Sequence, residues 1–130
     1  MNVHEEMFAR SFIVPDKKER YLSLLGSRKG RKKIVDGLNH HTPLDRRYAH
    51  LLSSAQQNVP AIETILKQKG APEVCYIMSS DPDIDGKEME LHQALMTVVD
   101  SNIGTVVSCI AGKLGYFEFE DIGERYILER

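Results

Sequence analysis

Residues 105–119, TVVSCIAGKLGYFEF, decide the fold of this chain. The first six residues form an apolar, β-favouring run that predicts a strand. Gly112-Lys113 suits a two-residue hairpin turn, because glycine takes the positive φ that such turns require. Residues 116–120 then alternate between aromatic and acidic side chains. This alternation predicts a second strand with one face in the core and one in solvent.

The segments on either side extend this pattern. Residues 74–78, VCYIM, predict a strand buried on both faces. Asp85 is a candidate cap for a helix with an apolar stripe at Leu91, Leu95 and Val98. Gly123 marks a turn before the last strand, in which Arg125 can lie opposite Glu118 or Glu120. A strand-helix-strand unit favours a parallel pair with a right-handed crossover. Residues 73–130 therefore predict a mixed four-stranded sheet of order β-α-β-β-β.

The first 72 residues predict helices with recognisable start and stop signals. Asn2 and Ser27 are candidate N-caps, as is Asp16 after Pro15, and Gly26 and Gly70 follow apolar stripes as stop signals. Thr42-Pro43 predicts a further helix start, because proline is tolerated at the first helical position. That helix would carry an apolar stripe at Leu44, Tyr48, Leu51 and Leu52. The fold class expected is α+β, with N-terminal helices packed on the sheet.

Length and composition predict one domain over residues 1–130, with a helical half at 1–72 and a sheet half at 73–130. Hydrophobic residues make up 42% and charged residues 28%, which excludes a disordered chain. Apolar runs are too short to span a bilayer, and the N-terminus does not resemble a secretory signal. We therefore expect a cytoplasmic protein, no membrane partner, and reduced, buried thiols at Cys75 and Cys109. A disulfide between them is the alternative if their strands are adjacent.

Charge is distributed unevenly along the chain. Residues 1–70 contain 13 Lys and Arg against 7 Asp and Glu, and residues 71–130 contain 4 against 12. Asymmetry of this kind is a hint of a surface that faces a polyanion. The alternative is that the basic and acidic halves complement each other within one molecule or across a self-associating interface.

The strongest candidate site is the basic run at residues 28–33, which places five cations in six positions. Contact with a phosphate backbone needs several cations, because each neutralised phosphate releases counterions. Arginine adds bidentate geometry on phosphate oxygens. The candidate polyanion-binding residues are Arg28, Lys29, Arg31, Lys32, Lys33, Arg46 and Arg47. The alternative is a solvated face, because the isoelectric point is near 6.2 and no nucleic-acid-binding motif is present.

A second candidate is the acidic loop at residues 81–86. Asp81, Asp83 and Asp85 match the opening of a calcium loop, in which alternating carboxylates converge on one cation. The match fails at the closing position, where His92 replaces the required glutamate. The competing interpretation is two turns and a helix cap. His40 and His41 lie in a loop, where ligands and general bases often occur, but no zinc-binding spacing includes them.

No motif identifies a reaction, and none of the residues matches the signature of a named family. The segment Gly112-Lys113 lacks the remainder of a phosphate-binding loop, and Ser108-Cys109 lacks a nucleophile motif. The hypothesis that the sequence favours is a binding module, not an enzyme, with no cofactor, which contacts nucleic acid or another phosphorylated ligand. A protein-interaction or self-associating module and a small metal-dependent hydrolase are the alternatives.

Overall fold

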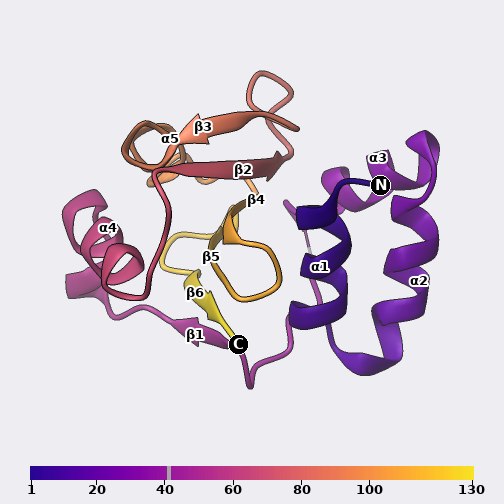
Figure 1. Ribbon diagram of the computed structural model, residues 1–130, viewed down its shortest axis with the longest axis horizontal. Coiled ribbons are helices and arrows are strands. Elements are labelled where there is room, and N and C mark those ends of the chain that lie inside the picture. Colours follow the sequence, from indigo (N-terminus) through magenta and orange to yellow (C-terminus); the bar gives the residue numbers. More distant parts are fainter. Residues whose placement is uncertain (41) are drawn as a thin grey trace.

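A six-stranded antiparallel sheet runs through the middle of the molecule, between two layers of helices (Figure 1). The computed structural model describes residues 1–40 and 42–130. The helices are α1 (Val3–Phe12), α2 (Pro15–Leu25), α3 (Arg28–Gly37), α4 (Val59–Gln68) and α5 (Leu91–Val98), with a 3-10 turn at Ser54–Gln56. The strands are β1 (Ala49–Leu51), β2 (Val74–Ser79), β3 (Glu88–Glu90), β4 (Thr105–Ile110), β5 (Leu114–Glu118) and β6 (Arg125–Glu129). The predicted α+β class is confirmed.

The order of strands across the sheet is β1-β6-β5-β4-β2-β3, and each neighbouring pair is antiparallel. The prediction of a mixed four-stranded sheet is therefore wrong. The sheet contains the four predicted strands and two short edge strands, β1 and β3, that the sequence pattern did not indicate. Each edge strand occupies a stretch that was predicted to be helical.

Strand β3 explains why the predicted parallel pair is antiparallel. The chain leaves β2, turns through Gly86 at φ +75°, and returns as β3 beside β2. Helix α5 begins only at Leu91, with the Glu90 side chain as its cap, and its eight residues run back along the sheet for about 12 Å. Strand β4 therefore starts beside the end of β2, where Ser79 pairs with Thr105. One extra reversal of the chain changes the direction of β4.

Strand β1 lies where a helix was predicted after Thr42-Pro43, and that prediction is wrong. The backbone N–H of Asp45 donates to the Phe12 carbonyl at 2.7 Å, and Val14 N–H donates to the Pro43 carbonyl at 2.9 Å. These bonds tie the segment to the connection between α1 and α2. Residues 49–51 then pair with β6. Long-range backbone hydrogen bonds override the local helix signal here, because propensity contributes only tenths of a kcal/mol per residue.

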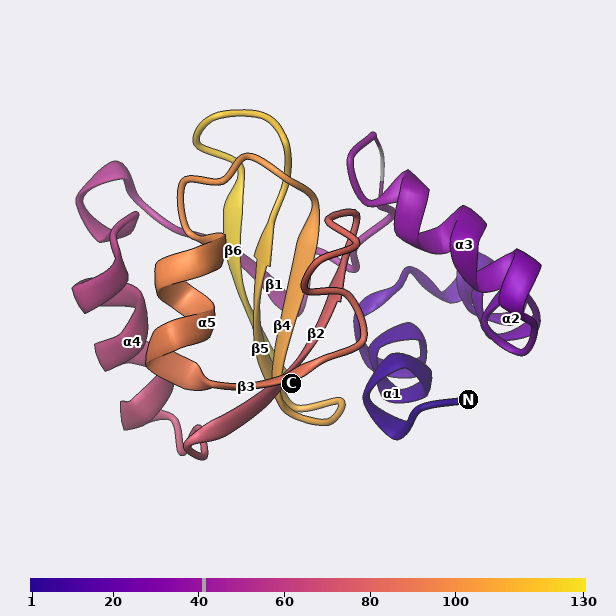
Figure 2. The same ribbon diagram turned by 90° about the horizontal axis from the view of Figure 1, so that it is seen from above.

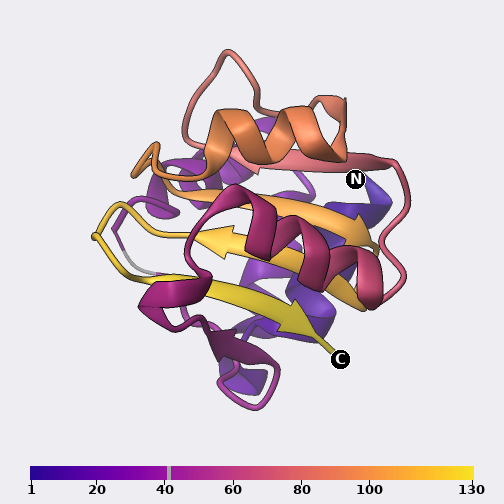
Figure 3. The ribbon, with the colours of Figure 1, turned by 90° about the vertical axis from the view of Figure 1, so that its left-hand side faces the viewer.

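Both faces of the sheet are covered, so there are two hydrophobic cores. Helices α4 and α5 lie on one face, and α1, α2 and α3 lie on the other (Figure 2). Seen from the side of α4, the two helices of its layer lie in front of the strands (Figure 3). Phe117 and Tyr126 face the α1–α3 layer, and Tyr116 and Ile127 face the α4–α5 layer. The predicted solvated face of β5 is therefore wrong, because Glu118 is completely buried.

Local signals in the α1–α3 layer are confirmed in part. Asn2 caps α1 by accepting from His4 N–H, and Ser27 caps α3 by accepting from Gly30 N–H. The predicted Asp16 cap is wrong, because α2 already begins at Pro15. Gly30 lets α2 and α3 approach closely, since a Cβ atom there would lie 2.2 Å from the Leu24 carbonyl oxygen.

Two further sequence predictions concern the membrane and the thiols. Among the described helices, no helix combines the length and apolar character needed to cross a bilayer. Cys75 and Cys109 are free and buried, on the adjacent strands β2 and β4. Burial raises the pKa of Cys75 to about 11 and that of Cys109 to about 12. Both thiols are therefore protonated and unreactive at neutral pH.

Candidate functional site

Arg31 joins α3 to α1 and to the connection between β2 and β3 through two carboxylates. Its guanidinium donates from Nε and Nη2 to Glu5 at 2.8–3.1 Å, and from Nη1 and Nη2 to Asp85 at 2.7–2.8 Å. Glu5 is buried and also accepts a short hydrogen bond from the Tyr76 hydroxyl. Asp85 also accepts from Ser79 N–H at 3.0 Å. We call Glu5, Arg31, Tyr76 and Asp85 the Arg31 cluster.

The charges of the Arg31 cluster stabilise one another. Hydrogen bonds to Asp85 and Glu5 raise the pKa of Arg31 above its ordinary value. Burial, and then the hydrogen bond to Glu5, raise the pKa of Tyr76. The hydroxyl therefore remains a donor to the carboxylate. Of the five guanidinium N–H groups of Arg31, four are used in these bonds, and one on Nη1 has no acceptor among the described residues.

The other cations of α3 are exposed. Lys32 forms an exposed pair with Asp36, one helical turn further on, at 2.8 Å. Such pairs contribute only about 0.3–0.5 kcal/mol, so Lys32 can exchange Asp36 for another anion at little cost. Arg28, Lys29 and Lys33 have no carboxylate within ion-pair distance among the described residues. We call Arg28, Lys29, Lys32 and Lys33 the α3 cations.

Arg46 and Arg47 lie apart from the α3 cations. Their turn adjoins the connection between α1 and α2, at the other end of α2 from α3 (Figure 1). Arg46 donates to the Tyr126 hydroxyl at 2.5 Å, and its guanidinium lies over the Tyr126 ring. Arg47 pairs with buried Asp45 at 2.7 Å, and the hydrogen bond from its guanidinium lowers the pKa of that carboxyl. The seven predicted residues thus form two groups, and Arg31, Arg46 and Arg47 have partners within the fold.

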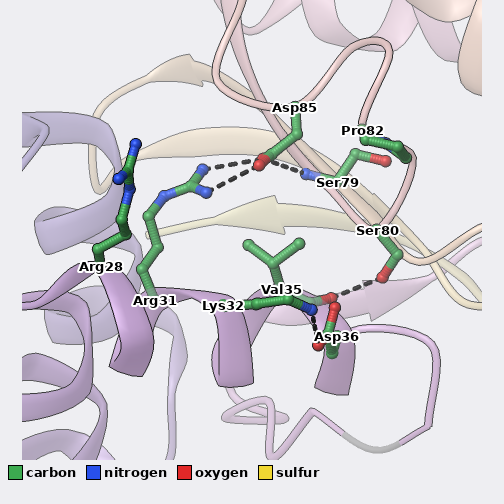
Figure 4. A pocket seen from close by; sticks show the side chains of 9 residues that line it. All are labelled: Arg28, Arg31, Lys32, Val35, Asp36, Ser79, Ser80, Pro82 and Asp85. Carbon is green, nitrogen blue, oxygen red and sulfur yellow. Dashed lines mark hydrogen bonds and ion pairs between the residues drawn. The ribbon is translucent and has the colours of Figure 1, made fainter.

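A groove with a volume of about 440 Å³ lies between α3 and the connection from β2 to β3 (Figure 4). Two walls form it. The α3 wall consists of Arg28, Arg31, Lys32, Val35 and Asp36, and the opposite wall consists of Ser79, Ser80, Pro82 and Asp85. Two contacts hold the walls together: the Arg31–Asp85 pair and the hydrogen bond from Ser80 Oγ to the Val35 carbonyl at 2.6 Å. The groove is therefore formed without a ligand.

Two of the three carboxylates of the predicted metal loop, those of Asp81 and Asp85, have partners of their own. Asp85 binds Arg31, and Asp81 accepts from Asp83 N–H at 2.9 Å in a local turn. Within residues 1–40 and 42–130, no group of three or more metal-ligating side chains is placed to hold an ion. The loop instead supplies one wall of the groove.

Histidines are spread over the molecule. His4 Nδ1 lies 2.7 Å from Ser108 Oγ, and its ring stacks on Tyr76. The adjoining hollow has no room for a water molecule, so this pair has no space for a substrate. His92 contacts Glu63 at 2.7 Å. His40 is exposed, and His41 lies outside the described residues.

Sequence reasoning found the α3 cations but missed most of the groove. It had no signal for Val35 opposite Pro82, or for Glu5 beside Arg31, because these residues are far apart in the chain. Glu5 lies three residues after the cap Asn2, the spacing of a capping box, but its side chain binds Arg31 instead. A charge three residues after a cap is compatible with either role.

Comparison with known proteins gives no match to a family model, to a curated protein or to a solved structure. The proposals below therefore rest on the geometry of the α3 cations and the groove.

Proposed function

We propose that this protein is a nucleic-acid-binding module that contacts the phosphate backbone with the α3 cations. The observation that carries the proposal is the set of four exposed cations on one helix, three of which have no carboxylate partner among the described residues. A phosphate backbone binds such a row because counterions are released, and each neutralised phosphate adds to the affinity.

The rigidity of α3 supports the proposal. Gly30 brings the helix against α2, and Arg31 fixes it to the sheet through Glu5 and Asp85. Cations on a fixed helix lose less conformational freedom on binding than cations on a mobile tail.

Self-association through the basic and acidic halves is the alternative to this proposal. Two ion pairs that join these halves, Arg31–Asp85 and Lys69–Glu129, form within one molecule. Complementary charge between the halves thus contributes to the fold of a single chain. The α3 cations take no part in these two pairs, and this favours an external polyanion as their partner. Light scattering at low and high salt measures self-association directly.

Fluorescence anisotropy with labelled single-stranded RNA, single-stranded DNA and duplex DNA tests the proposal. We expect binding at low salt that weakens steeply as salt is added, with a slope of log K against log salt of about −3 for single strands if four phosphates are neutralised. Lys29→Gln with Lys33→Gln should roughly halve that slope for single strands, because two of the four phosphate contacts are lost.

The matched control is Lys67→Gln with Lys113→Gln, which removes the same charge from exposed positions elsewhere. It should leave the slope nearly unchanged. The proposal is wrong if none of the three probes binds at low salt, or if the control pair weakens binding as much as the α3 pair.

A further inference from the structure

The groove beside the α3 cations has the chemistry of a small-ligand site. Its volume of about 440 Å³ lies within the range of about 300–1,000 Å³ that is typical of such sites. Pro82 supplies exposed apolar surface from one wall, Val35 on the other wall adds little because it is only 7% exposed, and Arg28 and Lys32 supply positive charge from the α3 wall. A ligand that matches must combine a flat apolar part with an anionic part.

The charges also make the two ends of the groove different. Arg28 is at the first turn of α3 and Asp36 near its last turn, so the two ends of the α3 wall differ in sign (Figure 4). Lys32 lies one turn from Arg28, and Val35 lies about 10 Å from Arg28 along the helix axis. An anionic group is therefore favoured at the Arg28 end and an uncharged ring at the Val35 end.

We infer that this groove holds one nucleotide, with its phosphate on Arg28 and Lys32 and one face of its base on Pro82; this inference rests on the proposed nucleic-acid binding. A base presents an apolar face that a side chain such as proline can cover. The free N–H of Arg31 Nη1 is a further donor for a phosphate oxygen. The nucleotide belongs either to a strand, as an unstacked base, or to a free mononucleotide.

The hydroxyl groups of the groove do not contact this ligand. Ser79 Oγ bonds Thr105 Oγ1 at 2.7 Å inside the sheet, and Ser80 Oγ bonds the Val35 carbonyl. The Ser80 bond holds the two walls at a fixed separation. A preformed groove reduces the ordering cost of binding.

A nuclear magnetic resonance titration of the labelled full chain with AMP, adenosine and inorganic phosphate tests the inference. AMP should shift the amide signals of Arg28, Val35 and Asp85, with an affinity at least tenfold above those of adenosine and phosphate, because it uses both ends of the groove. The inference is overturned if AMP causes no groove shifts, or if phosphate alone binds as tightly as AMP.

Pro82→Glu places a carboxylate in the groove, and Pro72→Glu makes the same change at an exposed position away from it. Only Pro82→Glu should weaken the binding of AMP and of single-stranded RNA, by tenfold or more. If RNA binds at least a hundredfold more tightly than AMP and competes with it, the nucleotide in the groove belongs to a strand. If AMP binds as tightly as RNA, the groove takes a free nucleotide.

Different results would contradict the backbone contact and the groove assignment. If RNA binds, Lys29→Gln with Lys33→Gln weakens it, and Pro82→Glu does not, the groove assignment is wrong and the backbone contact stands. If no nucleic acid binds but AMP shifts the groove signals, the backbone contact is wrong and the groove is a mononucleotide site.

Discussion

Arg31 and Arg125 each hold two carboxylates, but they do so in different surroundings. The Arg31 side chain is 27% exposed at the joint between α3 and the sheet, and the Arg125 side chain is 5% exposed inside the sheet. Arg125 pairs with Asp100 at 2.7 Å and lies 3.4 Å from Glu118. We call Asp100, Glu118 and Arg125 the Arg125 cluster.

The two clusters satisfy their charges by different means. In the Arg31 cluster the guanidinium donates to both carboxylates. In the Arg125 cluster, Glu118 accepts mainly from Tyr116 and from the backbone N–H of Asn102, at 2.7 and 2.8 Å. Arg125 Nε has no hydrogen-bond acceptor in the part of the chain that the structure describes. The Arg125 cluster holds the left-handed turn between α5 and β4, where Asp100 and Asn102 have φ of +69° and +56°. The Arg31 cluster holds a whole layer of helices and borders the groove. The Arg125 cluster therefore fixes a turn within the fold, and the Arg31 cluster connects the fold to the candidate site.

Glu118→Ala should give the largest loss of stability. It leaves Arg125 buried beside a single exposed partner and removes the acceptor of two backbone N–H groups. Breaking a buried pair in this way costs about 3–5 kcal/mol. Urea unfolding measures the change. A double substitution, Glu118→Leu with Arg125→Met, should recover part of the loss, because it leaves no uncompensated buried charge; a loss below about 1 kcal/mol for Glu118→Ala would contradict the role given to this cluster.

Arg31→Ala should cost less, about 2–3 kcal/mol, because solvent reaches Asp85 and the Tyr76 hydroxyl still donates to buried Glu5. Lys33→Ala on the same helix is the matched control and should change stability by no more than about 0.5 kcal/mol. The same urea experiment measures both. Equal effects of the two substitutions would show that Arg31 is one more surface cation and would remove the distinction between it and its neighbours.

Gly30→Ala tests how firmly α3 is seated. The added Cβ would meet the Leu24 backbone at 2.2 Å, so α2 and α3 must separate, at a cost of about 1–3 kcal/mol. Gly37→Ala, at the open end of α3, meets nothing within 4 Å and should raise stability by up to about 1 kcal/mol through helix propensity. Thermal unfolding of the two variants should move in opposite directions, and a neutral Gly30→Ala would mean that the helices tolerate a wider spacing.

The smallest effect expected is a pH dependence of stability that comes from His4, whose ring stacks on Tyr76 of the Arg31 cluster. Burial lowers the pKa of His4 below its ordinary value of 6.5, and the negative charge of Glu88 opposes this shift. Its ring contacts Ser108 and Tyr76. The unfolded chain therefore binds a proton at His4 more readily than the folded chain. The contribution of neutral His4 to the free energy of unfolding is complete above pH 6.5 and declines as the pH falls below that value.

His4→Asn removes that titration. Between pH 7.5 and 5.5 the parent protein should lose stability relative to the variant, as measured by urea unfolding at each pH. If the difference between the two is constant over this range, His4 titrates alike in both states and the assigned burial effect is absent.

Local signals in the sequence predicted a large part of the fold. The strands at β2, β4, β5 and β6 and the caps at Asn2 and Ser27 were predicted because each depends on residues within a few positions of one another. The edge strands β1 and β3 were not, because three-residue strands gain their stability from the neighbour that they pair with. Missing β3 was enough to reverse the predicted direction of β4.

By itself, the sequence determined the alternating apolar pattern, the turn glycines and the concentration of positive charge in residues 28–33, since these are properties of neighbouring residues. Only the tertiary structure decided which charges are internal. Glu118, expected in solvent, is in the core, and Arg31, expected on the surface with its neighbours, binds Glu5 and Asp85. The physical reason is that burying a charge depends on partners that arrive from distant segments, and local spacing carries no record of them.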